Sequence, residues 1–155
     1  MSGRDYILEL VERAGEALAM MISGRAADEA RHDEADPRAN FEAEFGDIHP
    51  HLLRVDPGSA ALLLRRPWRI RRYALLLIQR EAAGGDADAH EAAARRALEL
   101  LLRAEAIEPR QETELFTALA AIAERSRLEP EALAALRVMG VMGVMGADGG
   151  RDGGV

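Results

Sequence analysis

Apolar residues near the N-terminus recur at steps of three and four, and this spacing constrains the fold more than any other feature of the sequence. In an α helix such positions share one face, whereas a half-buried strand would need alternation at every second residue. The pattern predicts a helix that begins near Ser2, whose spacing to Asp5 is that of a capping box, and that ends before Gly24. The apolar stripe consists of Ile7, Leu10, Val11, Ala14, Leu18, Met21 and Ile22.

The rest of the chain has the same helical character. Of its 155 residues, 30 are Ala and 20 are Leu, all 20 basic residues are Arg, and only 4% are aromatic. Ala, Leu, Arg and Glu favour helices, and strand-forming residues are scarce. We therefore expect an all-α fold with a single helical domain over residues 1–137. Residues 138–155 contain Val-Met-Gly three times and a Gly-rich end, and we expect them to form a disordered low-complexity tail.

Proline and glycine divide the domain into about six or seven predicted helices. Phe41 and Phe45 are an i,i+4 pair that should dock a short helical turn onto the core. A longer helix opens at Pro67 and runs to about Ala83, with Trp68 expected on its broad apolar face together with Ile70, Tyr73, Ala74, Leu77 and Ile78. The remaining predicted pieces are 48–54, 59–66 with Asp56 as cap, 86–106 capped by Asp86 or Asp88, 109–126 beginning at Pro109, and a last helix from Pro130.

The turn at Gly85 indicates how these helices pair. Ala97 and Leu98 follow Gly85 by twelve and thirteen residues, as in the second helix of a tetratricopeptide repeat, where a small Ala allows close packing. No second copy occurs at the period of such repeats. We therefore expect a tetratricopeptide-like stack of antiparallel hairpins, with the N-terminal amphipathic helix docked on it, rather than a true repeat array.

Charge is distributed unevenly along the chain. The formal net charge is -7, but the acidic segment 25–47 directly precedes the basic segment 48–80. Two interpretations stay open: the arginines pair internally with the acidic segment, or a face formed by Arg69, Arg72 and Arg80 binds the carboxylates of a partner. Contact with nucleic acid through the Arg-rich face of residues 65–72 is an alternative, although the negative net charge disfavours it.

The sequence offers no set of residues suited to catalysis. Cysteine is absent, which excludes thiol nucleophiles and Cys-ligated zinc. The four histidines, His32, His49, His51 and His90, lack the spacing of known metal sites, and no Ser or Thr lies in a nucleophile or phosphate-loop context. The stretch 121–133 resembles a helix-turn-helix, but the helix that should read bases carries Ala, Leu and Val. We expect a non-enzyme without cofactor or metal.

The chain also lacks the marks of a membrane or exported protein. Its longest uncharged run, residues 138–147, is far shorter than the ~20 residues that a spanning helix needs. The first 22 residues carry four acidic side chains, which suits neither a signal peptide nor a transit peptide. We therefore expect a cytoplasmic protein with no membrane partner.

The opening residues Arg4-Asp5-Tyr6-Ile7-Leu8, and the helix that continues through Ala14, Leu18 and Ile22, resemble the start of a bacterial family known as domain of unknown function 6483. The resemblance covers most of residues 4–137 and is most specific in the first helix. It implies a small all-helical protein with tetratricopeptide-like packing, and it brings no activity or site residues with it. The acidic segment 25–47 and the Val-Met-Gly tail depart from the family pattern.

Together these observations predict a protein-interaction or scaffold module. The expected partner is a protein or peptide held in a helical groove, with Arg69, Arg72 and Arg80 as the residues that contact it. The apolar stripe of the first helix has two alternative uses, since it either belongs to the core of the monomer or joins two copies in a homodimer.

Overall fold

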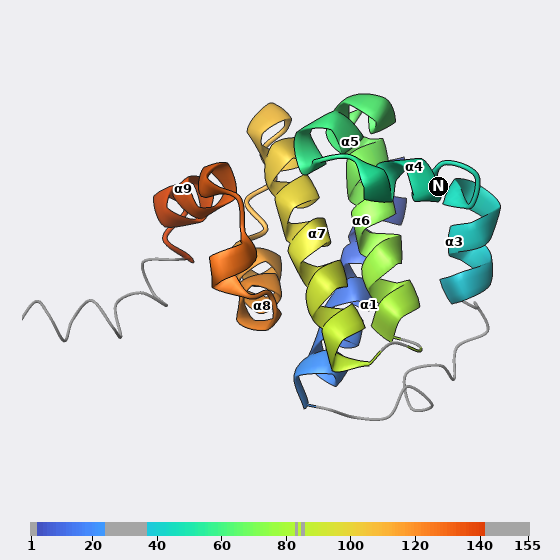
Figure 1. Ribbon diagram of the computed structural model, residues 1–155, viewed down its shortest axis with the longest axis horizontal. Helices are drawn as coiled ribbons and strands as arrows, with labels where there is room; N and C mark the ends of the chain where they lie inside the picture. The colour runs from blue at the N-terminus through green and yellow to red at the C-terminus, as the bar shows by residue number, and fades with distance from the viewer. Residues whose placement is uncertain (1–2, 24–36, 83, 85, 142–155) are drawn as a thin grey trace, which may run out of the picture.

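The computed structural model describes residues 3–23, 37–82, 84 and 86–141, and Figure 1 shows their arrangement. This part of the chain forms eight α helices and one 3-10 turn, without strands, so the predicted all-α class is confirmed. The described residues contain more helices than the six or seven predicted, because Phe41 and Phe45 lie on a nine-residue helix instead of a short turn. The helices are α1 (Gly3–Ser23), α3 (Pro37–Phe45), α4 (His49–Arg54), α5 (Pro57–Leu64), α6 (Pro67–Ala82), α7 (Ala87–Ile107), α8 (Thr113–Ile122) and α9 (Pro130–Val138), with the 3-10 turn at Arg125–Arg127.

Helices α6 and α7 form the centre of the molecule. They follow one another through the short turn at Gly84 and pack side by side as an antiparallel hairpin (Figure 1). From Ile70 to Gln79 every residue of α6 except Arg72 is buried, which agrees with a sequence that is apolar nearly all round. Helices α1 and α3 pack against α6, whereas α5, α8 and α9 pack against α7. The hairpin thus carries the other helices on its two sides.

The helix starts follow the local sequence. Asp56 caps α5 by accepting from the Ser59 backbone N–H at 3.1 Å, and Asp86 caps α7 by accepting from the Ala89 N–H at 2.9 Å. Proline stands in the first turn of α5, α6 and α9, where its missing N–H costs no hydrogen bond. Helix α3 ends before Gly46, and this position needs glycine, because a Cβ there would lie 2.6 Å from the Glu42 carbonyl oxygen. The predicted caps and helix starts at these positions are confirmed.

The predicted start of a helix at Pro109 is wrong, since α8 begins four residues later at Thr113. The carboxylate of Glu105 accepts from the backbone N–H of Arg110 at 3.0 Å and of Gln111 at 2.9 Å. Gln111 takes a positive φ of 56°, which an α helix does not allow. The glutamate near the end of the preceding helix therefore draws this segment into a loop, and hydrogen bonds spanning only five and six residues override the start signal of the proline.

The central part of the apolar stripe of α1, for which burial is described, lies inside the monomer. Leu10, Ala14 and Leu18 are buried, and α1 packs against α6 and α8. Burying each leucine contributes roughly 1.5–3 kcal/mol of hydrophobic free energy. The stripe that was an alternative dimer surface is thus used within one chain, and a homodimer stays a prediction.

The packed structure extends past the predicted boundary at residue 137. Helix α9 runs to Val138, Met139 packs against the core, and the side chain of Val141 is buried. The rest of the predicted tail lies outside the described residues, as does the predicted solvated helix over residues 25–36. Within the described part of the chain, no helix combines the length and apolar character needed to cross a bilayer.

Candidate functional site

Helices α1, α3 and α6 enclose an open groove with a volume of about 490 Å³. This volume lies within the roughly 300–1,000 Å³ typical of ligand sites. Leu10 and Leu76 supply apolar surface. Each helix adds charge: α1 contributes Glu9 and Arg13, α3 contributes Glu44, and α6 contributes Arg72. The groove is lined by Glu9, Leu10, Arg13, Asn40, Ala43, Glu44, Arg72, Leu76 and Gln79.

The three arginines predicted to contact a partner all lie against α3. Arg72 forms an ion pair with Glu44, with Nε and Oε2 2.5 Å apart, and both residues line the groove. The guanidinium of Arg69 lies over the Phe45 ring at 5.7 Å, and that of Arg80 lies over the Phe41 ring at 4.8 Å. For Arg72 and Glu44, internal pairing with the acidic segment is thereby confirmed. Only Arg72 of the three lines the groove, and the partner role of all three stays a prediction.

Arg80 also lines a separate open cavity of about 290 Å³ with Glu42, Glu81 and Gly84. Its guanidinium lies 3.4 Å from the Glu81 carboxylate and 3.2 Å from His49 Nε2. The three arginines therefore do not form one face. Arg72 lines the groove, Arg80 lines the separate cavity, and Arg69 lies over the Phe45 ring.

An aromatic cluster beside this face joins α3 and α4 to α6. His49 Nδ1 lies 2.8 Å from the Tyr73 hydroxyl, and Phe41 and Phe45 pack around the pair. A guanidinium can only donate, so His49 Nε2 accepts from Arg80 and His49 Nδ1–H donates to Tyr73. This tautomer is neutral, in keeping with a pKa of His49 that burial and then Arg80 lower from its ordinary value.

The His49–Tyr73 pair joins helix α4 to helix α6 in the interior of the fold. The Tyr73 side chain is fully buried, and this burial raises the pKa of its hydroxyl to about 12. A phenol with so high a pKa, closed off by two phenylalanine rings, is a poor proton donor or nucleophile. Phe41 and Tyr73 had been predicted as core residues, but the hydrogen bond to His49 had not been foreseen.

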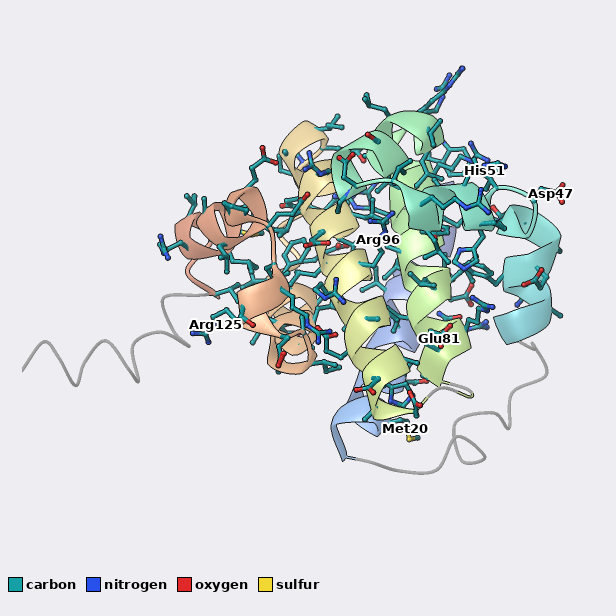
Figure 2. The ribbon with its side chains drawn as sticks, in the orientation of Figure 1. Met20, Asp47, His51, Glu81, Arg96 and Arg125 are labelled. Atoms are coloured by element: carbon teal, nitrogen blue, oxygen red, sulfur yellow. The ribbon has the colours of Figure 1, made fainter. Side chains whose placement is uncertain are left out.

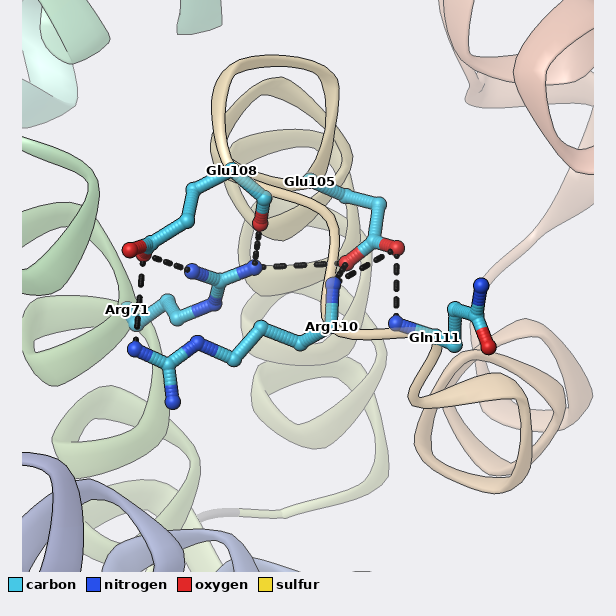
Figure 3. Close-up of polar contacts among 5 residues, drawn as sticks. All are labelled: Arg71, Glu105, Glu108, Arg110 and Gln111. Carbon is cyan, nitrogen blue, oxygen red and sulfur yellow. Dashed lines mark hydrogen bonds and ion pairs between the residues drawn. The ribbon is translucent and has the colours of Figure 1, made fainter.

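A second polar cluster, built around the buried Arg71, lies where α6 meets the end of α7 (Figure 3). Arg71, with a side chain only 1% exposed, donates to the Glu108 carboxylate at 3.0 Å, to Glu105 at 3.2 Å and to the Glu108 carbonyl oxygen at 2.7 Å. Arg110 lies 3.4 Å from the same Glu108 carboxylate. Arg71 shares a face of α6 with the buried Ala74 and Leu75, but its glutamate partners lie 34 and 37 residues away, so helical periodicity alone does not predict its burial.

Other polar side chains of α7 hold the backbone of neighbouring segments. Glu91 accepts from the Glu124 N–H at 2.7 Å, and Glu99 accepts from the Glu129 N–H at 3.2 Å, just before α9. Arg96 of α7, labelled in Figure 2, donates to the carbonyl oxygens of Leu52 in α4 and of Val55 just after α4. These charged residues therefore serve the fold by satisfying backbone groups in loops.

No group of three or more potential metal ligands occurs among the residues that the structure describes. His49 is engaged with Tyr73 and Arg80, and His51 is exposed on α4 (Figure 2). His32 lies outside the described residues. The hydroxyls of Ser59 and Thr117 donate to Asp56 and to the Thr113 carbonyl oxygen, as is usual in helical turns.

No family model matches the chain, and no curated protein or solved structure matches it. The resemblance to domain of unknown function 6483 therefore stays a prediction, and the function has to be argued from the groove and the surface.

Proposed function

We propose that this chain is a non-catalytic protein-interaction module that binds a peptide segment of a partner in the groove between α1, α3 and α6. The observation that carries the proposal is the composition of this groove, in which charges of both signs surround apolar residues. Specific binding sites commonly combine apolar surface with a few oriented polar groups. A peptide that presents both a cationic and an anionic side chain would match it.

The groove is preorganised where the peptide would lie. The ion pair with Glu44 orients the Arg72 guanidinium, and the Gln79 amide, itself buried, donates to the Leu10 carbonyl oxygen at 3.5 Å. Groups that are already ordered lose less conformational entropy on binding. Arg13 and Glu9 add a second pair of opposite charges from α1.

The non-catalytic part of the proposal rests on where the ionisable groups lie. Arg71, Glu105, Glu99 and His49 all bond to neighbouring helices or loops, and none of them lines the groove. We further propose that the α6–α7 hairpin is tetratricopeptide-like and that α6 forms the inner wall of the groove. We also propose that the protein acts in the cytoplasm of a bacterium.

Selection from a random-peptide phage library against the immobilised full chain tests this function. We expect enriched peptides that carry both charges, and at least tenfold weaker binding of these peptides to Ala43→Phe, which fills the groove from the exposed side of α3. The matched control is Ala121→Phe, which adds the same ring to an exposed position of α8.

Failure to enrich any peptide would contradict the proposal. So would enriched peptides that bind Ala43→Phe as well as they bind the unchanged chain.

A further inference from the structure

The turn from α5 to α6 exposes a compact set of apolar and basic side chains, which we call the α5–α6 corner. Leu62 is 78% exposed, and Leu63 and Trp68 are each 45% exposed. The sequence had placed Trp68 on the buried face of α6, so this prediction is wrong: the helix has only begun at Pro67, and the first residue to reach the core is Ile70. The corner comprises Leu62, Leu63, Arg65, Arg66 and Trp68, all of them exposed.

The backbone of the corner is well defined. Arg65 has φ 77° and ψ -60°, and the Arg66 N–H donates to the Leu64 carbonyl oxygen at 2.9 Å. These angles and this bond are those of a γ-turn with positive φ, a strained conformation that non-glycine residues rarely adopt. Leu64 and Ile70, fully buried on either side of the turn, anchor it to the core. The exposed side chains are thus presented by a fixed support.

The corner is locally basic in an acidic protein. No carboxylate among the described residues pairs with Arg65 or Arg66. The only acidic residue between His49 and Ile70 is Asp56, and its carboxylate accepts from the Ser59 N–H and hydroxyl. Several arginines elsewhere in the fold are paired with glutamates, as Arg71, Arg72 and Arg103 are. Arg65 and Arg66 are therefore available for carboxylates from outside.

We propose that the α5–α6 corner is a docking surface for an acidic amphipathic helical segment of a partner protein, separate from the α1–α3–α6 groove. The apolar side chains of that segment pack on Leu62, Leu63 and Trp68, while its carboxylates pair with Arg65 and Arg66. Trp and Arg are the residues most enriched among those that dominate binding energy, and Arg recognises carboxylates through two parallel hydrogen bonds.

The same corner fits a nucleic acid or an anionic bilayer less well. A phosphate backbone is contacted by a track of cations, but Arg71 is buried and Arg69 and Arg72 lie against α3. A bilayer presents its charge over a wide plane and would also face acidic parts of a chain whose net charge is -7. A short peptide helix can contact the corner without contacting the acidic parts of the surface.

Trp68 is the only tryptophan of the chain, so its fluorescence reports on the corner directly. The probe is a synthetic tryptophan-free helix with Leu on one face and Glu on the other, titrated into the full-length protein. We expect a saturable shift of Trp68 emission to shorter wavelength. A double variant, Arg65→Glu with Arg66→Glu, should weaken binding at least tenfold while leaving the melting temperature unchanged.

Two controls fix the interpretation. Arg125→Glu reverses an exposed charge on the side of the molecule formed by α8 and α9 (Figure 2) and should leave the affinity unchanged. Ala43→Phe, which fills the groove, should also leave it unchanged, so that this proposal and the groove proposal can fail separately.

Absence of binding would overturn the proposal, as would equal affinity for a twin peptide with Lys in place of Glu. Loss of binding in Ala43→Phe would instead place the peptide in the groove. Tighter binding to duplex DNA or to anionic phosphatidylserine vesicles than to the acidic helix would assign the corner to one of those partners and not to a protein.

Discussion

Arginine is the only permanently cationic side chain in this protein, and the arginines range from fully buried to exposed. Arg71 is almost fully buried and forms bonds to Glu105 and Glu108, whereas Arg65 and Arg66 are exposed. A buried charge needs its partner, because an unpaired charge in a low-dielectric interior is strongly disfavoured. An exposed arginine can change with little effect on stability. Stability and binding should therefore respond to different arginines.

Replacing Arg71 by Met should destabilise the fold. The change removes the cation but leaves the Glu105 carboxylate, which is only 12% exposed. We expect a loss of about 3 kcal/mol in the free energy of unfolding, measured by urea denaturation. The control Arg127→Met, at a side chain 61% exposed, should change this free energy by less than about 0.5 kcal/mol. Equal effects of the two variants would contradict a structural role for the buried cluster.

Glu99 should make the fold less stable at neutral pH than a neutral residue would. Burial raises the pKa of Glu99 above its ordinary value of 4.5, so its stabilising contribution is complete below pH 4.5 and is lost as pH rises through the folded pKa. Glu99→Gln keeps an oxygen that accepts from the Glu129 N–H and removes the charge. We expect a higher melting temperature at pH 7 and no advantage below pH 4.5.

Glu114→Gln, at an exposed position of α8, is the matched control for this comparison and should show no such gain. A Glu99→Gln variant that melts lower than the unchanged chain at pH 7 would show that the carboxylate's charge is needed there.

At the scale of helices, local signals in the sequence predicted most of the architecture. Asp56 and Asp86 each accept a hydrogen bond from the backbone N–H three residues later. This contact caps the helix without help from the rest of the fold, so the local sequence predicts it. Pro109 failed as a start signal because Glu105 satisfies the following N–H groups from another helix. The burial of Arg71 and the groove itself depend on which helices become neighbours, and this pairing is not encoded in local periodicity.

Helix α1 should be needed for folding rather than for dimerisation. Leu10 is buried against the rest of the monomer, so Leu10→Ala should lower the free energy of unfolding by about 2–5 kcal/mol. Sedimentation velocity should give the same molecular mass for this variant and for the unchanged chain. A dimer that dissociates on this substitution, with little loss of stability, would show that the stripe joins two copies. Glu12→Ala, on the exposed side of α1, is the control.

The docking of α3 and α4 on α6 should weaken in mild acid. The pKa of His49 is lowered from 6.5 by burial and Arg80, so the unfolded chain takes up a proton before the folded one does. The stability contributed by neutral His49 is complete above pH 6.5 and falls as pH drops toward the folded pKa. Between pH 7.5 and 5.5 the melting temperature should fall more steeply for the unchanged chain than for His49→Gln. His51→Gln, at an exposed position, should keep the original slope, and identical slopes for all three would contradict this role.

For the whole molecule, the net charge of -7 hides an uneven surface. The acidic and basic segments pair in part within the chain, as Glu44 and Arg72 do. The groove is lined by charged side chains of both signs. The α5–α6 corner keeps a basic excess next to exposed leucines and the single tryptophan. The corner lies at the start of α6 and the groove lies along its later turns, and we propose these two surfaces as the binding sites of the molecule.

The most direct test of the central claim is a map of amide chemical-shift changes in the isotope-labelled protein on addition of a peptide selected by phage display. Binding in the groove predicts changes concentrated in three stretches, Glu9 to Arg13, Asn40 to Glu44 and Arg72 to Gln79. Changes concentrated instead on α8 and α9, or none at saturating peptide, would contradict the proposal that this chain binds a partner segment between α1, α3 and α6.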